Sequence, residues 1–155
     1  MMILCPHFLI DIMKNLVIIG AGGMGRTIFD VARESIGYGI EYTIKGFIDD
    51  NLSALDGFED YPPMLGTISH YLPEVDDVFT FSIGGESRRV CIEYLMERNA
   101  KFINIVHSTA RIGSNVRMGE GNVIGAFTSL GADCSIGSYN MIQSYTVIGH
   151  DAKIG

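Results

Sequence analysis

Residues 108–155 read STARIGSNVRMGEGNVIGAFTSLGADCSIGSYNMIQSYTVIGHDAKIG. A bulky apolar residue recurs at every sixth position of this stretch, and a smaller side chain stands two positions before each one. Neither an α-helix nor a flat strand has a period of six, whereas a chain that turns a corner every six residues does. The bulky residues are Ile112, Met118, Ile124, Leu130, Ile136, Ile142, Ile148 and Ile154, and the smaller ones are Ala110, Val116, Asn122, Thr128, Cys134, Asn140, Thr146 and Ala152. The repeat predicts a parallel β-helix with both columns pointing inward.

The composition of the whole chain narrows the function classes. The chain has 155 residues, of which 47% are apolar, and its 11 basic and 18 acidic residues give a net charge of −7. An acidic balance argues against a nucleic-acid-binding surface. The three cysteines have no CxxC spacing, so the sequence suggests neither a disulfide framework nor a zinc or other metal site.

The first thirteen residues, MMILCPHFLIDIM, are apolar but shorter than the roughly 20 residues that span a bilayer. They also lack the basic start and the small-residue cleavage site of a signal peptide. We expect residues 1–13 to be a disordered extension and the protein to be cytoplasmic, without a membrane partner.

A nucleotide-binding pattern follows this extension. Asn15–Ile19 (NLVII) suits a buried parallel strand, and GAGGMG follows it directly, with Gly20, Gly22, Gly23 and Gly25. A helical pattern comes next, and the order strand, GxGxxG, helix is the context in which this motif binds a phosphate at the helix N-terminus. The apolar face of this helix is expected to contain Ile28, Val31, Ala32 and Ile36.

Acidic residues end the second expected strand, Tyr42–Ile48. Asp49 lies 24 positions after Gly25, and Asp50 follows it. In dinucleotide-binding domains an acidic residue about 20 positions after the glycines binds the ribose hydroxyls. We predict that Asp49 and Asp50 bind a nucleotide, with a solvated loop as the alternative.

A second strand–glycine–helix unit completes an α/β Rossmann-like domain over residues 14–106. We expect a short helix at 66–71, a strand at 78–83, Gly84 as a ligand contact and a helix at 86–99, and a last strand at 102–106. The second helix is expected to bury Val90, Cys91, Tyr94 and Leu95. A parallel β-helix over residues 107–155 would follow.

These features resemble the sugar O- and N-acetyltransferases of the NeuD and PglD type. The resemblance rests on GAGGMG, on GFIDD at 46–50 and on IVHSTA at 105–110, in order before the hexapeptides, and covers residues 14–155. It implies a left-handed β-helix with three hexapeptides per coil, and therefore about two and two-thirds coils over residues 107–155. It also implies a homotrimer with active sites between subunits, acetyl-CoA as donor, and a nucleotide-linked sugar as acceptor. N- and O-acetylation both remain open.

The hexapeptide register places candidate chemistry at one corner. His150 comes two positions after Ile148, so it projects outward, and three hexapeptides per coil put Ala132 beside it. The resemblance assigns His150 as the general base and Asp151 as the carboxylate that orients it, and neutral imidazole suits such a role. Gln143 interrupts the glycines that follow the bulky column elsewhere, and is a candidate polar contact to substrate.

Two features limit this assignment. Met24 stands where relatives often have histidine, and the sequence ends five residues after His150, so we expect most of the acetyl-CoA site to be missing. One alternative function is a non-catalytic nucleotide-sugar-binding or trimerisation module. Another is an NAD-dependent Rossmann enzyme, although the repeats have no role in it.

Overall fold

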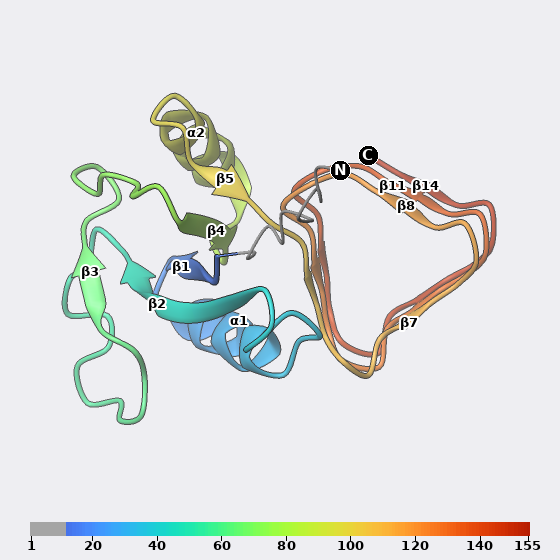
Figure 1. Cartoon of the computed structure of the whole chain (residues 1–155), viewed down its shortest axis with the longest axis horizontal. Helices are drawn as coiled ribbons and strands as arrows, with labels where there is room; N and C mark the ends of the chain where they lie inside the picture. Colours follow the sequence, from blue (N-terminus) through green and yellow to red (C-terminus); the bar gives the residue numbers. More distant parts are fainter. Residues whose placement is uncertain (1–11) are drawn as a thin grey trace, which may run out of the picture.

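The computed structural model describes residues 12–155, as an α/β domain beside a triangular β-helix (Figure 1). The predicted extension lies outside the described residues, apart from the exposed Ile12 and Met13. Neither helix in the described part of the chain is long and apolar enough to cross a bilayer.

The α/β domain is built on a parallel five-stranded sheet with the order β3-β2-β1-β4-β5. The strands are β1 (Lys14–Ile19), β2 (Tyr42–Ile48), β3 (Met64–Gly66), β4 (Asp77–Phe81) and β5 (Lys101–Phe102). The order of the strands along the chain reverses between β1 and β4. In open α/β sheets such a reversal creates a crevice at the carboxyl ends of the two strands, where ligands bind.

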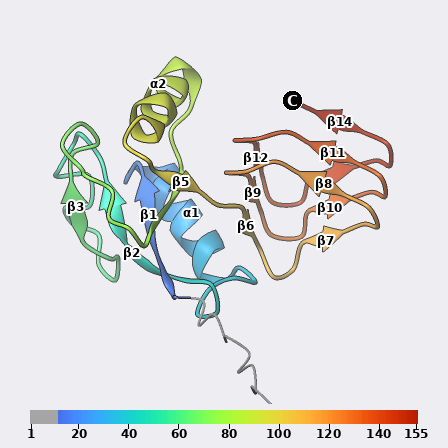
Figure 2. The ribbon, with the colours of Figure 1, turned by 45° about the horizontal axis from the view of Figure 1, so that its top comes forward.

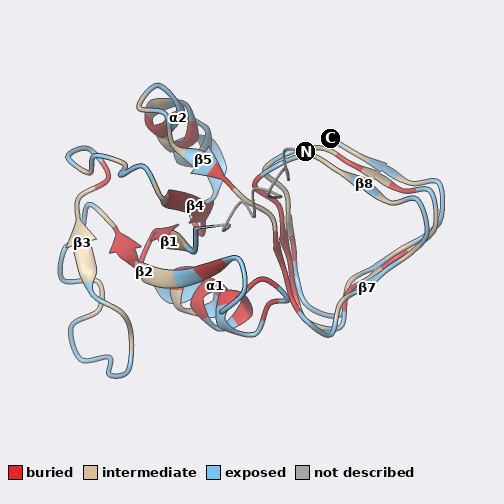
Figure 3. Ribbon diagram, viewed as in Figure 1, coloured by how far each residue is buried: buried red, intermediate tan, exposed pale blue. Residues whose placement is uncertain are grey.

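The two helices, α1 (Gly23–Arg33) and α2 (Gly85–Met96), cover opposite faces of this sheet. Alternate residues of β1 point to the two faces, so Leu16 and Ile18 pack with α1, whereas Val17 and Ile19 pack with α2. All four are fully buried, and the burial colouring shows the buried segments gathered where helices and strands meet (Figure 3).

Three expectations for this domain were wrong. Ile36 is 62% exposed because α1 ends at Arg33, and Val90 is 65% exposed on the outer side of α2. Residues 66–71 form no helix: β3 ends at Gly66, and a turn follows it. The inward positions are instead filled by residues such as Phe29 and Ile92, which are 8% and 6% exposed.

The β-helix has three faces, and each face is a parallel sheet of three strands. The coils are stacked along one axis (Figure 2). Paired residues on successive strands are 18 positions apart, as Ser129 and Val147 are, so three hexapeptides make one coil. One face consists of β6 (Ile105–Val106), β9 (Val123–Ile124) and β12 (Met141–Ile142). The next consists of β7 (Arg111–Ile112), β10 (Ser129–Leu130) and β13 (Val147–Ile148), and the third of β8 (Arg117–Met118), β11 (Ser135–Ile136) and β14 (Lys153–Ile154).

The first rung of the β-helix lies two residues before the boundary expected from the sequence. The expected strand at 102–106 is divided: Phe102 pairs with β4 in the α/β sheet, whereas Ile105–Val106 pairs with β9. The additional rung raises the β-helix from the expected two and two-thirds coils to three. The apolar segment at 102–106 therefore contributes a strand to each domain. Because the two strands are nearly continuous in sequence, the apolar pattern predicts a single strand.

Side chains inside the β-helix follow the two predicted columns. Ile124, Leu130 and Cys134 are fully buried in the middle of the stack. Asn122 and Asn140, both in the smaller column, form a ladder of asparagines. The Asn140 backbone N–H donates to Asn122 Oδ1 at 2.9 Å, and the Asn122 backbone N–H donates to Asn104 Oδ1 at 2.8 Å. Seven corner residues adopt left-handed backbone with φ between 55° and 69°: Asn115, Gly121, Phe127, Asp133, Tyr139, Tyr145 and Asp151.

The junction between the domains is held by a buried histidine. His107 is 6% exposed, and its Nδ1 accepts the Thr109 backbone N–H at 3.1 Å, so the ring proton resides on Nε2 and is donated to Glu34 Oε2 at 2.9 Å. The Ile36 N–H also donates to the Val106 carbonyl. These contacts fix the face formed by β6, β9 and β12 against the end of α1.

Candidate functional site

The glycine loop joins β1 to α1 in a tight, closely packed turn. Gly20 has a φ of +93°, a conformation that disfavours other residues. A Cβ added to Gly25 would lie 2.1 Å from the Gly20 carbonyl oxygen, so only glycine lets α1 start so close to β1. Ser82 Oγ, buried at the end of β4, lies 2.8 Å from the Ile19 carbonyl oxygen and 3.0 Å from that of Gly20, and supports the loop from below.

Two helix N-termini converge on the crevice between β1 and β4. α1 has Gly22 as its N-cap and α2 has Gly84, and neither helix is capped by a side-chain hydrogen bond. The first N–H groups of a helix have no partner within the helix and carry its positive dipole end. Gly22, Gly23 and Gly84 are exposed, so these donors are open to a ligand, as phosphate groups require.

The two predicted acidic residues are engaged by backbone N–H groups of this same edge. Asp49 Oδ2 accepts from Ala21 at 2.8 Å and its Oδ1 accepts from Asn51, so the carboxylate ties the glycine loop to the end of β2. Asp50 Oδ1 accepts from the Ile68 N–H at 3.1 Å. The structure therefore brings Asp49 beside the glycine loop, with each oxygen retaining a further lone pair for a ligand.

Two arginines at this edge were not assigned to the site by the sequence. The Arg26 guanidinium lies 3.7 Å from the centre of the Phe58 ring, which fixes it in the first turn of α1 near Gly23. Arg88, in the first turn of α2, lies over Phe81 at 5.2 Å. The position of Arg26 directly after GAGGMG could have indicated its place in the site. Its contact with Phe58 could not be predicted, because Phe58 lies in a long loop without a recognisable sequence pattern.

His150 and Asp151 occupy the corner between β13 and β14. His150 Nδ1 lies 2.6 Å from Asp151 Oδ2, and both side chains are exposed, by 82% and 74%. The hydrogen bond to Asp151 and its negative charge raise the pKa of His150, with a smaller contribution in the same direction from Asp133. Because Nδ1 donates to the carboxylate, the neutral ring presents an unprotonated Nε2 to the surroundings, which is the arrangement of a general base.

Ala132 lies one coil before His150, as the register predicts. The Asp151 N–H donates to the Ala132 carbonyl at 3.0 Å, and the backbone of Gly131 packs directly against that of His150. Small residues at these positions leave the face beside the imidazole uncovered.

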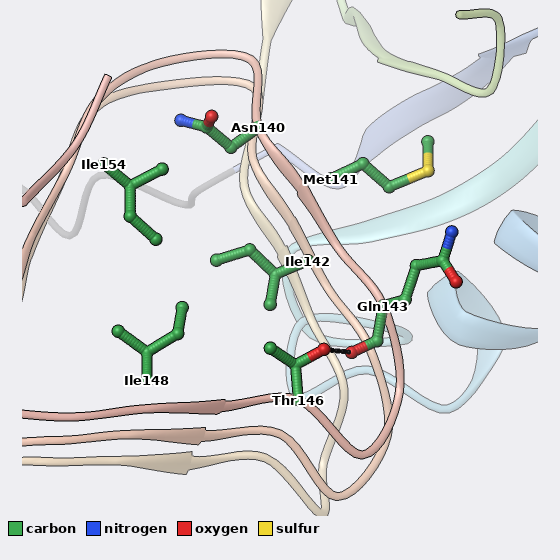
Figure 4. Close-up of a pocket in the computed structure, with 7 residues that line it drawn as sticks. All are labelled: Asn140, Met141, Ile142, Gln143, Thr146, Ile148 and Ile154. Atoms are coloured by element: carbon green, nitrogen blue, oxygen red, sulfur yellow. Dashed lines mark hydrogen bonds between the residues drawn. The ribbon is translucent and has the colours of Figure 1, made fainter.

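Gln143 lies at a different corner. Its side chain points out of the triangle, whereas Ile142, Ile148 and Ile154 point inward around a hollow of about 490 Å³ (Figure 4). Its backbone carbonyl accepts from Thr146 Oγ1 at 2.7 Å. The strand β13 separates Gln143 from His150, so one chain does not bring these two residues together.

The glycine edge and the His150 corner also lie apart within one chain. The α/β domain packs against the face of β6, β9 and β12, whereas the corner between β13 and β14 is the one farthest from that domain (Figure 1). Among residues 12–155, no three His, Cys, Asp or Glu side chains converge as metal ligands.

A Rossmann-like domain joined to a left-handed hexapeptide β-helix defines a class of transferases, and comparison with known proteins identifies the family. Residues 15–95 match the PglD N-terminal domain, and residues 115–150 match the bacterial transferase hexapeptide with six repeats. The first match spans more than half of the chain. The chain therefore belongs to the NeuD/PglD-type acetyltransferase family.

Individual relatives support this placement. The chain is 31% identical over 117 residues to the UDP-N-acetylbacillosamine N-acetyltransferase of Bacillus subtilis, covering 72% of this chain and 51% of that protein. The chain thus spans about half the length of the curated relative it matches.

Solved structures share the fold. The acetyltransferase domain of PglB from Neisseria gonorrhoeae, in complex with acetyl coenzyme A, has a TM-score of 0.75 and 23% identity over 91% of this chain and 67% of that chain. PerB from Caulobacter crescentus, in complex with CoA and GDP-perosamine, has a TM-score of 0.74 and 24% identity over 90% of this chain and 65% of that chain.

Proposed function

We propose that this protein transfers an acetyl group from acetyl-CoA to an amino group of a nucleoside-diphosphate sugar. The observation that carries the proposal is the His150–Asp151 pair, placed on a hexapeptide β-helix beside a glycine-loop domain. The name of the Bacillus subtilis relative and the ligands of the two solved neighbours support the donor and the class of acceptor. The relative is an N-acetyltransferase, which favours an amine over a hydroxyl acceptor.

His150 acts as the general base in this proposal. Its Nε2 accepts a proton from the acceptor nitrogen as that nitrogen attacks the thioester carbonyl carbon. The carbon–sulfur bond then breaks, and the proton passes to the departing thiolate, giving CoA and the N-acetylated sugar. Asp151 holds the ring in the tautomer that exposes Nε2 and stabilises the imidazolium that forms.

The α/β domain binds the nucleotide in this proposal. The open N–H groups at Gly22, Gly23 and Gly84 would receive the diphosphate, with Gly20 and Gly25 shaping the loop. Asp49 lies beside the loop, where it can also accept from a ribose hydroxyl, and Asp50 lies next to it.

Within one chain the two halves of the proposed site lie on opposite sides of the β-helix, so we infer that a neighbouring copy in a homotrimer completes the site. Exposed apolar side chains offer a surface for such a copy: Phe127 and Tyr145 stack at 5.1 Å on the corner that carries Gln143, and the neighbouring Val147 is 78% exposed. Apolar patches of this kind are typical of protein–protein interfaces.

A rate measurement with His150→Ala, made in a full-length protein that carries this sequence, tests the proposal. Release of CoA is followed with a thiol-reactive dye, using acetyl-CoA and amino-sugar nucleotides with UDP or GDP. We expect kcat to fall about 10²- to 10⁴-fold without a change in the free energy of unfolding, because the base is exposed. Undiminished transfer by His150→Ala would leave the β-helix as an assembly module only. A thermal-shift screen over the nucleotides, with NADH included, separates a sugar-nucleotide site from an NAD site.

Mixed assembly tests the shared site. The His150→Ala and Gly22→Val chains are mixed in equal amounts. Each is expected to be inactive alone, the first because it lacks the base and the second because a side chain covers the phosphate donors. If the site lies between copies, mixing unfolded chains and refolding them together restores part of the activity. Absence of recovery in folded, mixed oligomers would contradict a site that lies between subunits.

A further inference from the structure

A second carboxylate lies next to the His150–Asp151 pair along the β-helix axis. The corner between the second and third faces is occupied in successive coils by Asn115, Asp133 and Asp151, whose φ values are 58°, 62° and 60°. Backbone hydrogen bonds stack these corners, because the Asp133 N–H donates to the Ser114 carbonyl and the Asp151 N–H donates to the Ala132 carbonyl. Adjacent strands are about 4.8 Å apart, so Asp133 and Asp151 are separated by about one strand spacing.

The Asp133 side chain is held in this column. Asn115 Nδ2 donates to Asp133 Oδ1 at 3.0 Å, which fixes the carboxylate at the corner. The turn itself does not need a charge, since asparagine adopts the left-handed backbone equally well, as Asn115 does one coil earlier. A carboxylate directly beside another carboxylate is unfavourable unless a cation lies near both.

We propose that Asp133 is a positioning residue that acts through His150, as the second of two carboxylates that stabilise the imidazolium formed during proton transfer. The inference rests on the proposed acetyl transfer for its catalytic meaning, whereas the electrostatic coupling of Asp133 to His150 rests on the stacked corners and on the charge of Asp133, and needs no activity. Asp133 itself makes no direct contact with the reacting atoms in this proposal.

The direction of the effect follows from the charges around the ring. Asp151 raises the pKa of His150 most, through its hydrogen bond and its charge, and Asp133 adds to the shift through its charge. The charged side chains on the flanking strands are Arg111, Arg117 and Lys153, and none of them is a cause of the upward shift. Because the ring is exposed, the contribution of Asp133 acts through solvent and is screened by salt.

NMR titration of the histidine rings measures this coupling without any need for activity. The chain has four histidines, and the resonance of His150 is the one that disappears in His150→Ala. We expect Asp133→Asn to lower the titration midpoint of His150, by less than Asp151→Asn does, and the difference from wild type to shrink in about 1 M salt, where the Debye length is about 3 Å.

A matched control removes a charge elsewhere on the β-helix. Glu120 accepts from the Tyr139 hydroxyl at a different corner, so Glu120→Gln changes the net charge equally and is expected to leave the midpoint unchanged. Asp133→Gly, which also suits left-handed backbone, provides a second uncharged variant if asparagine disturbs the fold. A midpoint in both Asp133 variants that equals that of Glu120→Gln would overturn the inference.

The pH dependence of kcat/KM then tests the catalytic role. Asp133→Asn is expected to move the acidic limb of the profile to lower pH, together with the NMR midpoint, and to lower the limiting kcat by a smaller factor than Asp151→Asn. An unchanged profile beside a shifted NMR midpoint would remove Asp133 from catalysis. If a full-length protein that carries this sequence transfers no acetyl group, the proposed function fails, and the NMR result alone still decides the coupling.

Discussion

The two domains form their candidate sites from different parts of the chain. In the α/β domain the groups proposed to bind a ligand are backbone N–H groups, and Gly20 and Gly25 allow the close turn between β1 and α1 that positions them. At the β-helix corner the groups proposed to act are the side chains of His150 and Asp151, which project from a coil whose interior they do not enter. The first site is inseparable from the packing of its domain, whereas the second can be altered without loss of stability. Substitutions in the two regions should therefore differ in kind.

The largest effect is expected at Gly25. Gly25→Ala places a Cβ 2.1 Å from the Gly20 carbonyl oxygen and 2.8 Å from its carbon, so α1 must move away from β1. We expect the free energy of unfolding to fall by about 3 kcal/mol or more, as overpacking against rigid backbone does. Denaturant unfolding followed by circular dichroism measures the change.

The control for Gly25 is its neighbour Gly23, in the same helical turn. A Cβ there meets only the Arg26 side chain, at 3.8 Å, and alanine favours helix over glycine by about 1 kcal/mol. Gly23→Ala should therefore be neutral or stabilising. Equal loss of stability in both variants would contradict this explanation, because it would show that any side chain in the loop is destabilising and not only one at the close contact of Gly25.

The next effect concerns the interior of the β-helix. Leu130 is 0% exposed, whereas Ile112, in the same column one coil earlier, is 39% exposed. Leu130→Ala should cost about 2–5 kcal/mol and Ile112→Ala clearly less, because the cost follows the apolar area that each side chain buries. Denaturation midpoints of the two variants check the order. Equal losses of unfolding free energy in the two variants would mean that the contribution of each side chain to stability does not depend on its burial.

The difference between the domains also explains what the sequence could predict. In the β-helix one register fixes the direction of every side chain, so the outward His150, the inward Cys134 and the inward Asn122 all followed from a period of six. The pairing of β6 with β9 was missed because Ile105–Val106 continues the apolar run of β5. The left-handed corners, in contrast, share no residue type beyond frequent Asn and Asp, and several are aromatic.

In the α/β domain the sequence predicted the central strands, the glycine turn and most of the burial on the helices, as Ile28, Val31, Ala32 and Leu95 show. Ile36 fits the helical period but lies beyond the end of α1 at Arg33. Val90 also fits it, but the orientation of α2 on the sheet buries Ile92 instead. The site residues beyond the motif also depend on tertiary contacts. Ser82 supports the glycine loop from the neighbouring strand, and no local pattern announces that contact.

A pH-dependent effect of moderate size is expected at Asp77, at the amino end of β4. Burial would raise the pKa of Asp77, but hydrogen bonds from Lys45 at 2.9 Å, from Tyr71 at 2.6 Å and from the Glu74 N–H lower it below its ordinary value. The stabilisation is thus complete above the pKa of the unfolded carboxyl, about 3.9, and is lost as the pH falls through the folded value. Asp77→Asn should cost about 1–3 kcal/mol near neutral pH.

Stability measured from neutral pH to about pH 2 checks this prediction, because asparagine does not titrate. The wild-type protein should lose part of its free energy of unfolding over the acidic range, and Asp77→Asn should show a correspondingly shallower slope. Asp76→Asn is the control, since Asp76 pairs with Lys14 at a partly exposed site and should change stability by less than about 1 kcal/mol. Parallel pH curves for wild type and Asp77→Asn would contradict the assignment.

The smallest effect compares one substitution in both domains. Thr80 is fully buried in β4, and its hydroxyl has no hydrogen-bond partner within the described residues, whereas buried Thr128 in the β-helix donates to the Gln143 carbonyl at 3.1 Å. Replacing threonine by valine removes the hydroxyl and keeps the shape. Thr80→Val should therefore raise the free energy of unfolding by about 1 kcal/mol, and Thr128→Val should lower it by about as much, because it leaves a carbonyl with one donor fewer.

Thermal and denaturant unfolding of both valine variants give the two signs directly. Thr80→Ser and Thr128→Ser serve as controls, because each keeps its hydroxyl and loses one methyl group, so both should be destabilising by about 1 kcal/mol. A destabilising Thr80→Val would mean that a bound water satisfies the hydroxyl beneath α1. Opposite signs for the same substitution would show that the Thr128 hydroxyl stabilises the β-helix through its hydrogen bond. The α/β core, in contrast, contains a buried hydroxyl, that of Thr80, which has no partner among the described residues and is destabilising.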